Sequence, residues 1–455
     1  MRKIVIIMFL FAVAAHAQDT AAIDKAATEV LAKTGAPSAS IAVVKDGRIV
    51  YAHAYGLARI EPPLPATPEM RYSIGSISKQ FTASAILMLA EEGKLSLDDK
   101  MARWFPDLTR ASDVSIRELL SMTSGYQDFW PQDYVMPRML EPVTAQEILN
   151  DWAKKPLDFE PGTKWQYSNT NYVIAGMIVE KVAGMPLLDF LQQRIFGPLH
   201  MTTVYNTDLS PLGADEPMRY MRYAIGPLRP APKEGRGWMF AAGELAMTAS
   251  DLAKWDISII DQSILKPQSY KVLETEIELS SGVGTHYALG IGVGMNDGRR
   301  ALSHGGEVSG FTATNTIYPD DRAAIVVQTN IDANGASGQI AQRIATLLFA
   351  SNDPAIPATT AQMQKIFEGL QHGQIDRSLF TSNANAYFDD QALKDFASSL
   401  GPLGTWQEFV QASQSLRGGM TLRRYRIRFP QKTVILTTFI MPDGKIEQYQ
   451  IAPSE

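Results

Sequence analysis

The chain has 455 residues, of which 45% are hydrophobic and 20% are charged. This length suits two or three globular domains with a sizeable core, and the composition excludes a disordered chain. The net charge of −6 lacks the positive surplus typical of nucleic-acid-binding proteins, so no nucleic-acid partner is expected. There are no cysteines, which excludes disulfides, thiolate catalysis and cysteine-based metal sites.

The amino-terminal segment 1–17 is typical of a secretory signal peptide. Residues 1–3 form a short basic region, and residues 4–15 form an apolar run that is too short to span a bilayer comfortably. Residues 15–17 read Ala-His-Ala, which suits a cleavage site. We therefore expect a periplasmic or secreted protein with no membrane span in the mature chain. An uncleaved membrane anchor is the alternative.

The next part of the chain predicts a helix and then a β-hairpin. Residues 21–34 have the pattern of an amphipathic helix. Two strand-like runs within residues 40–56 flank Asp46-Gly47, which is a strong two-residue turn signal. In residues 76–93 the apolar side chains recur at helical spacing, so a second helix is expected there.

The centre of the chain predicts a large helical region between two groups of strands. Residues 110–270 read mostly as helices and loops with many Pro and Gly breakers. Strands return at 288–294, 311–318 and 323–329, and a helix is expected at 338–350. This order predicts an α+β fold, with one antiparallel sheet flanked by helices and a helical subdomain.

The last part of the chain predicts a separate small unit. Residues 351–360 contain two prolines and are expected to link a domain at 18–350 to an α+β module at 361–455. Helical patterns at 361–370 and 391–400 open the module. Four strand-like runs follow, at 406–411, 420–429, 433–441 and 445–451.

Several arginines crowd this module: Arg417, Arg423, Arg424, Arg426 and Arg428. A basic face that binds an anionic glycan or lipid is one interpretation. The solvated face of a strand is the other, and we favour it because charged side chains usually face water.

The first candidate for chemistry is the pair Ser76 and Lys79, three positions apart at the start of the helix predicted for 76–93. Residues at this spacing share a helix face, so the lysine amine can approach the serine oxygen. A serine hydroxyl needs a base to become a nucleophile, and a lysine can serve if burial and nearby positive charge lower its pKa. The alternative is that Ser76 only caps the helix.

Ser263 and Lys266 have the same spacing but a different context. Pro267 follows Lys266 and disfavours helical dihedral angles there. Ser263 also does not open a strongly apolar helix. The chemistry is therefore expected at Ser76.

Two later motifs add polar groups that could face Ser76. Tyr167-Ser168-Asn169 is expected in a loop, and His304-Gly305-Gly306 is expected at the end of a strand. Each has a plainer interpretation. Tyr167 could pack in an aromatic cluster, and His304 could simply end its strand.

Taken in order, the motifs at 76–79, 167–169 and 304–306 resemble those of the serine β-lactamase and penicillin-recognising hydrolase family. The likeness is greatest to class C β-lactamases, D,D-carboxypeptidases and related esterases. Flanking runs such as L-L-S-M-T-S-G-Y (119–126) extend it, and it covers roughly residues 20–350. The resemblance implies a β-lactamase-like fold.

The resemblance also implies roles for the site residues. Ser76 would be the acylated nucleophile, and Lys79 and Tyr167 would share its proton and deliver one to the leaving group. Asn169 would hold a substrate amide. The backbone N–H groups of Ser76 and Glu307 would form the oxyanion hole.

The third motif departs from the family pattern. His304 stands where the family has the lysine of a Lys-Thr-Gly strand, which supplies a fixed cation for a substrate carboxylate. A histidine is largely neutral at pH 7, so β-lactam hydrolysis is in doubt while acyl transfer is not. Gly305 and Gly306 suit a substrate lying along the strand edge, because no side chain stands in its way.

We therefore expect a serine hydrolase that acts through an acyl-enzyme on an ester or amide, of the esterase or D-amino-acid peptidase type. Its partner would be a small ester, peptide or β-lactam-like molecule, and no cofactor is expected. A D,D-carboxypeptidase or a weak class C-like β-lactamase is the alternative enzyme. The alternative of another class is a non-hydrolytic protein that binds cell-wall peptides. The presence of Ser76, Lys79 and Tyr167 disfavours this alternative.

Overall fold

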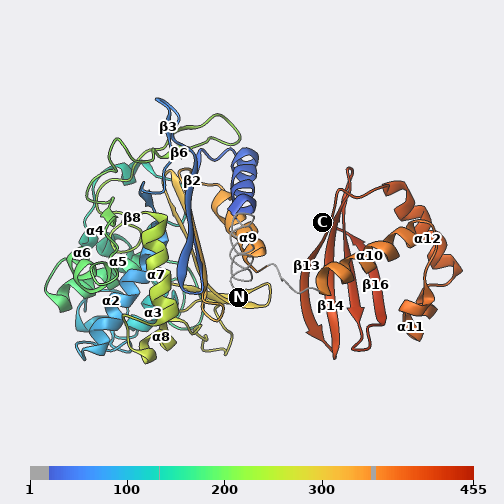
Figure 1. The fold of residues 1–455 in the computed structure, drawn as a ribbon. Helices are drawn as coiled ribbons and strands as arrows, with labels where there is room; N and C mark the ends of the chain where they lie inside the picture. The colour runs from blue at the N-terminus through green and yellow to red at the C-terminus, as the bar shows by residue number, and fades with distance from the viewer. Residues whose placement is uncertain (1–19, 133, 350–354, 455) are drawn as a thin grey trace, which may run out of the picture. The chain divides into compact units, whose positions relative to one another are not determined.

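A computed structural model of the chain describes residues 20–132, 134–349 and 355–454. The segment 1–17, expected as a signal peptide, lies outside the described residues. The chain divides into two compact units, one ending at Leu348 and the other beginning at Phe349. Each unit contains an antiparallel sheet with helices (Figure 1), so the predicted α+β class is confirmed.

The first unit is built around one antiparallel sheet of seven strands. Their spatial order is β3-β2-β1-β12-β11-β10-β9, so strands from the two ends of this unit lie side by side at the centre. The strands are β1 (Ser38–Lys45), β2 (Arg48–Arg59), β3 (Leu64–Pro65), β9 (Gly292–Asn296), β10 (Arg299–Val308), β11 (Phe311–Tyr318) and β12 (Ala323–Thr329).

The central strands are apolar because both faces of this sheet are covered. All residues of β12 are buried, as are all of β1 except its last, and strands buried on both faces lose the alternating pattern. The predicted hairpin joins β1 to β2. Asp46 and Gly47 both have positive φ angles, 53° and 71°, as a two-residue hairpin turn requires.

Helices cover the two faces of the sheet (Figure 1). The segments 20–34 and 336–348 are helical, as predicted. The helix at 20–34 and α9 lie on one face of the sheet, and α7 packs against β1 and β12 on the other. The helices after the first are α2 (Lys79–Glu91), α3 (Ile116–Leu120), α4 (Ala145–Ile148), α5 (Asn169–Ala183), α6 (Leu187–Leu191), α7 (Ala249–Asp261), α8 (Pro267–Leu273) and α9 (Ala336–Leu348).

Helix α2 runs through the main hydrophobic core. Every residue from Lys79 to Leu89 is buried, and Phe81 packs on Phe196 and Trp255. A helix that is buried on all sides is held by its neighbours along its whole length. The first residue of α2 therefore has a fixed position relative to the sheet.

Short strands complete the first unit. β4 (Tyr72–Ser73), β8 (Leu245–Met247) and β5 (Tyr205–Asn206) form a small sheet, and β6 (Tyr220–Met221) pairs with β7 (Arg229–Pro230). β4 leads directly into the turn before α2, so its pairing with β8 fixes where that turn begins.

The second unit is a four-stranded antiparallel meander with helices, as predicted. Its core contains Phe367 from a helix and Tyr425, Leu436 and Tyr449 from the strands, all buried. The elements are α10 (Ala355–Gln371), α11 (Ser382–Tyr387), α12 (Asp390–Leu400), β13 (Glu408–Arg417), β14 (Met420–Arg428), β15 (Thr433–Ile440) and β16 (Ile446–Pro453). Helix α11 was not predicted.

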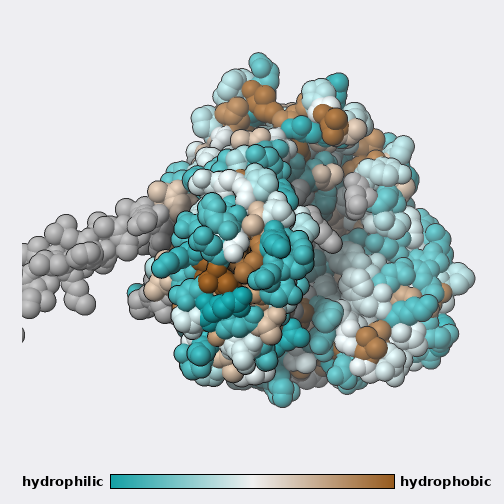
Figure 2. Space-filling view, turned by 90° about the vertical axis from the view of Figure 1, so that its right-hand side faces the viewer, coloured by the Kyte–Doolittle hydropathy of each residue, from teal (hydrophilic) through white to brown (hydrophobic). Residues whose placement is uncertain are grey.

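The arginine-rich strand β14 presents its charges to solvent. Arg424, Arg426 and Arg428 are exposed, whereas Arg423 lies on the buried face. Glu408 on β13 has carboxylate oxygens 3.5 Å from a nitrogen of both Arg426 and Arg428. These pairs favour the solvated-face interpretation. The surface seen in Figure 2 is mainly hydrophilic, with hydrophobic residues in small separate patches.

Several predicted boundaries were wrong. Helix α10 begins at Ala355, inside the expected linker 351–360, because a proline such as Pro357 is tolerated in the first turn of a helix. The strand predicted at 288–294 begins only at Gly292, since Gly290 has a φ of +77°.

The third difference concerns the strand that carries His304. His304 lies within β10 and not at its end. β9 pairs with β10 only as far as Ser303, however, so β10 becomes an edge strand from His304 onward.

Candidate active site

Ser76 lies in a short 3-10 turn, η1 (Gly75–Ser78), between β4 and α2. The predicted helix therefore begins as a tighter turn, in which residues three apart are nearly eclipsed. The residue at the N-cap of α2 is Ser78, and the N-cap of η1 is Ile74. The alternative that Ser76 only caps the helix is therefore wrong.

Lys79 follows this turn and its amine contacts Ser76. Lys79 Nζ donates hydrogen bonds to Ser76 Oγ at 3.0 Å, to Asn169 Oδ1 at 2.8 Å and to the Ala242 carbonyl at 2.8 Å. The three contacts come from three separate segments, and together they fix the direction of the amine.

The Lys79 side chain is fully buried, and burial lowers its pKa to about 7, while the carboxyl of Asp128 acts in the opposite direction. A large fraction of the amine is therefore neutral near pH 7. The three donated bonds belong to the charged form, whereas the neutral amine keeps two hydrogens for Asn169 and the Ala242 carbonyl. Its lone pair can then accept the proton of the Ser76 hydroxyl.

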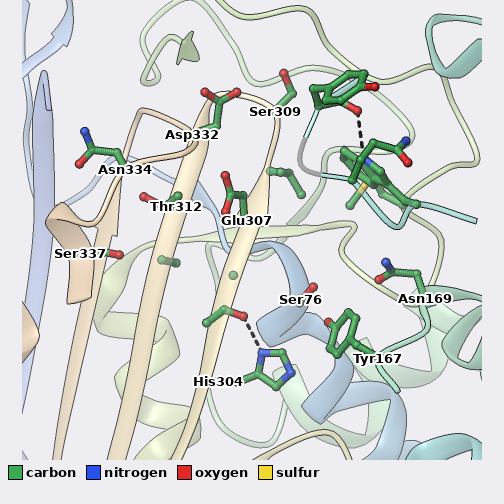
Figure 3. Close-up of a pocket in the computed structure, with 18 of the residues that line it drawn as sticks. Ser76, Tyr167, Asn169, His304, Glu307, Ser309, Thr312, Asp332, Asn334 and Ser337 are labelled. Carbon is green, nitrogen blue, oxygen red and sulfur yellow. Dashed lines mark hydrogen bonds between the residues drawn. The ribbon is translucent and has the colours of Figure 1, made fainter. Parts of the chain in front are cut away.

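Tyr167 is the second side chain that faces the nucleophile. Its hydroxyl points toward Ser76 (Figure 3), and its ring centre lies 4.9 Å from Lys79 Nζ. Burial raises its pKa, and a hydrogen bond with Ser76 opposes this. Tyr167 also packs near Trp165, at 6.5 Å between ring centres. Tyr167 thus packs against an aromatic neighbour and also faces Ser76, so the two interpretations of this residue do not exclude each other.

Asn169 begins α5, whereas the sequence indicated a loop. Its amide oxygen accepts from Lys79, and its side-chain nitrogen donates to Asp128 at 3.3 Å. Asp128 also accepts the backbone N–H groups of Asn169 and Trp130, at 2.9 and 3.2 Å. Burial raises the pKa of Asp128, which these hydrogen bonds and Lys79 oppose.

Sequence analysis missed Asp128. It follows the run at 119–126 by two residues, but nothing in its local pattern distinguishes it from other acidic residues in loops. Its importance comes from the contact with Asn169, which lies far away in the sequence.

Both ring nitrogens of His304 contact uncharged groups. Its Nε2 lies 2.9 Å from the Tyr287 hydroxyl, and its Nδ1 lies 2.5 Å from the Gly305 carbonyl. Burial, and then the charge of Lys79, lower its pKa to about 4. The site therefore has no fixed cation at the position of the family's lysine.

The strand after His304 runs directly against the turn that carries Ser76. A Cβ on Gly306 would lie 1.9 Å from the Ile74 carbonyl, and a Cβ on Gly75 would lie 2.6 Å from the Glu307 nitrogen. Only glycine permits these approaches. The backbone nitrogen of Glu307 thus lies beside η1, while the Glu307 side chain accepts the Ala333 N–H at 2.6 Å.

The predicted residues meet at one cavity of about 770 Å³ (Figure 3). Its lining includes Ser76, Tyr167, Asn169 and the segment 304–307. Lys79 is not part of the lining, but its amine contacts Ser76 Oγ. The described lining residues include the carboxyl groups of Asp128, Glu307 and Asp332 but no lysine or arginine. A substrate in this cavity would therefore meet carboxylates and neutral polar groups.

The second Ser-x-x-Lys match does not form such a site. Lys266 is the N-cap of α8 with an extended backbone (φ −69°, ψ 151°). Its side chain donates to the Glu91 carbonyl at 3.2 Å, and its backbone N–H donates to the Glu91 carboxylate. The prediction that Pro267 prevents a helical Lys266 is confirmed.

Known proteins resemble this chain. Penicillin-binding protein 4* of Bacillus subtilis (strain 168) is 27% identical over 340 residues, which cover 72% of this chain and 75% of that protein. A D-aminopeptidase of Brucella anthropi is 30% identical over 312 residues, 66% of this chain and 57% of that protein. The chain thus spans little more than half of that relative's length.

A solved structure shows the same fold over nearly the whole chain. The octameric penicillin-binding protein homologue from Pyrococcus abyssi matches with a TM-score of 0.65 at 23% identity, over 96% of both chains. No described helix is both long and apolar enough to cross a bilayer. Residues 23–348 match the family model described as Beta-lactamase. This match covers most of the chain and all of the site described above, and the chain therefore belongs to the Beta-lactamase family.

Proposed function

We propose that this chain hydrolyses esters or amides through an acyl-enzyme on Ser76. The observation that carries the proposal is the contact between Ser76 Oγ and the buried amine of Lys79, at 3.0 Å, with a lysine pKa of about 7. The relatives include a D-aminopeptidase, whose name describes a hydrolase.

In acylation, neutral Lys79 accepts the proton of Ser76, and Ser76 Oγ attacks the substrate carbonyl carbon. The carbonyl oxygen becomes an oxyanion, which the backbone N–H groups of Ser76 and Glu307 stabilise. The tetrahedral intermediate then expels the alcohol or amine, which takes a proton from Lys79 or Tyr167. The high pKa of Tyr167 keeps its hydroxyl protonated and able to donate.

In deacylation, water attacks the acyl-enzyme carbonyl and gives up a proton to the same pair of groups. Ser76 leaves with a proton, and the free enzyme is restored. Asn169 is proposed to orient a substrate amide with its side-chain amide, while its oxygen remains bonded to Lys79. No cofactor takes part in these steps.

The preferred substrates are proposed to be small esters, or amides and peptides of D-amino acids. The relationship to a D-aminopeptidase supports the second class. A neutral His304 gives a substrate carboxylate no cation to bind, which disfavours a D,D-carboxypeptidase or a weak β-lactamase. The assembled Ser76, Lys79 and Tyr167 favour an enzyme over a protein that only binds cell-wall peptides.

A substrate panel tests this proposal. We expect turnover of a p-nitrophenyl acetate ester and of D-alanine p-nitroanilide, and little turnover of nitrocefin or a D-Ala-D-Ala peptide. Absence of hydrolysis of every substrate, in a folded protein, would contradict the proposal of an enzyme. The same panel with the Ser76→Ala variant provides the background rate.

We also propose export of the chain to the periplasm or the medium, supported by the signal-like residues 1–17. Fractionation of expressing cells, followed by amino-terminal sequencing, tests this. A mature protein beginning near Gln18 is expected, and full-length protein retained in the cytoplasm would contradict it.

A further inference from the structure

Tyr287 lies behind His304 and touches it in two ways. The residue is buried at 6% exposure, just before β9. Its hydroxyl lies 2.9 Å from His304 Nε2, and the two rings meet edge to face with centres 5.8 Å apart. Trp165 packs on the same tyrosine at 5.7 Å. Tyr287 does not line the cavity, so any effect on a substrate is indirect, and His304 is the lining residue that its hydroxyl contacts.

The partners of His304 determine which ring nitrogen carries its proton. The Gly305 carbonyl can only accept a hydrogen bond, so the nitrogen next to it, Nδ1, carries the hydrogen. A neutral imidazole has one N–H, which leaves Nε2 as an acceptor. The Tyr287 hydroxyl has a second hydrogen-bond partner, the Tyr172 hydroxyl, whose own proton goes to the Leu120 carbonyl at 2.9 Å. Because Nε2 is left as an acceptor, we assign the single Tyr287 proton to Nε2 and not to the Tyr172 oxygen. The lowered pKa of His304 agrees with a ring that carries only one proton near pH 7.

We propose that Tyr287 is a positioning residue that holds His304 as the neutral Nδ1–H tautomer, with both ring nitrogens occupied, and thereby selects against substrates that carry a carboxylate. The selection against carboxylate substrates rests on the proposed hydrolase function, whereas the assignment of the His304 tautomer does not.

The surroundings of His304 support this selection. The Lys79 amine is buried, is already bonded to Ser76, Asn169 and the Ala242 carbonyl, and does not line the cavity. The described lining of the cavity contains no lysine or arginine. An anionic substrate group would lose its water shell here without gaining a cationic partner, which is costly. Neutral substrates escape this cost.

The test compares the wild type with Tyr287→Phe, which removes only the hydroxyl. Tyr126→Phe is the matched control, since Tyr126 is also buried and its hydroxyl donates to a different acceptor, the Thr109 carbonyl at 3.0 Å. Nitrogen NMR of the full chain at pH 7 reports the protonation of each imidazole nitrogen. A His304→Gln variant identifies the His304 signals among those of the six histidines.

In the wild type we expect a protonated Nδ1 and an unprotonated Nε2 that accepts a hydrogen bond. In Tyr287→Phe the Nε2 signal should move, and in Tyr126→Phe it should not. A wild-type His304 with the proton on Nε2 would overturn the proposal, and so would an unchanged Nε2 signal in folded Tyr287→Phe. The wild-type measurement decides the tautomer even if Tyr287→Phe does not fold.

The second readout is specificity. The ratio of kcat/KM for p-nitrophenyl hydrogen succinate to that for p-nitrophenyl butyrate should rise about fivefold in Tyr287→Phe, the effect of one net hydrogen bond, because Nε2 loses its donor and the ring can then take up a proton and attract the substrate carboxylate. It should not change in Tyr126→Phe. An unchanged or lower ratio in Tyr287→Phe would overturn the role in selection. A protein with the expected tautomer but no turnover would contradict the proposed function and leave the tautomer assignment standing.

Discussion

The amine of Lys79 and the hydroxyl of Ser76 are 3.0 Å apart because a 3-10 turn at the start of a helix that is buried from Lys79 to Leu89 places them on one side of the chain. The lysine also bonds Asn169 and the Ala242 carbonyl, so its direction is fixed from outside the helix. Burial makes the amine a weaker base than a free lysine, but one that is available at neutral pH.

The pH dependence of hydrolysis should follow Lys79. Its pKa in the folded protein is lowered to about 7, so the amine is charged below this pH and neutral above it. Because only the neutral amine can accept the Ser76 proton, kcat/KM for a neutral ester should rise with pH through about 7. A pH–rate profile from pH 5 to pH 9 measures this. A rate that falls with rising pH over this range would contradict the role of Lys79.

Replacing Lys79 should remove the base. Lys79→Ala is expected to lower kcat/KM by about 10²- to 10⁴-fold, the usual contribution of a general base. Lys266→Ala is the matched control, because Lys266 belongs to the second Ser-x-x-Lys match and contacts only Glu91 among the bonds described above. Steady-state kinetics with p-nitrophenyl acetate compare the two variants. Equal activity of both would show that Lys79 is not the base.

A cation at position 304 should change the preferred substrate. In His304→Lys a permanent ammonium would face the cavity and pair with a substrate carboxylate, which is worth on the order of 1 kcal/mol or more when partly desolvated. The ratio of kcat/KM for nitrocefin to that for a short neutral ester should therefore rise. His372→Lys, an exposed position in the second unit, is the control. A ratio that stays the same or falls would mean that residue 304 does not face the carboxylate.

The second unit is predicted to fold without the first and to take no part in the chemistry. Its core residues all come from the chain after Phe349, and every residue of the site described above lies before Leu348. A chain of residues 18–348 should keep its labelling at Ser76, and residues 355–455 should show cooperative thermal unfolding by circular dichroism. Aggregation of the shortened chain 18–348 does not test the prediction, because truncation exposes surface that is covered in the full chain. A soluble, folded piece that no longer labels would show that the second unit completes the site.

The residues predicted for the site were those whose motifs are local. Ser76 and Lys79 are one turn apart, and Tyr167 and Asn169 are two positions apart, so short patterns contain them. Asp128 and Tyr287 could not be found in this way, because each reaches the site through contacts with distant segments. Their roles depend on tertiary packing, which a single sequence does not specify.

The fold could be predicted where the sequence contains a clear turn signal such as Asp-Gly. Asp46-Gly47 indicated the first hairpin correctly. Asp297-Gly298, with φ angles of 48° and 79°, forms an equivalent turn between β9 and β10. That signal was present in the sequence, and using it would have corrected the strand predicted at 288–294. The order of the seven strands was not predictable, since pairing of β1 with β12 joins opposite ends of the unit.

Mapping of the acylated residue tests the central claim most directly. The full chain is treated with a fluorophosphonate, digested, and analysed by tandem mass spectrometry, alongside Ser76→Ala and Ser263→Ala. The nucleophile assignment predicts one adduct on Ser76 in the wild type and in Ser263→Ala, and none in Ser76→Ala. An adduct that persists in folded Ser76→Ala, or that maps to another residue in the wild type, would contradict it.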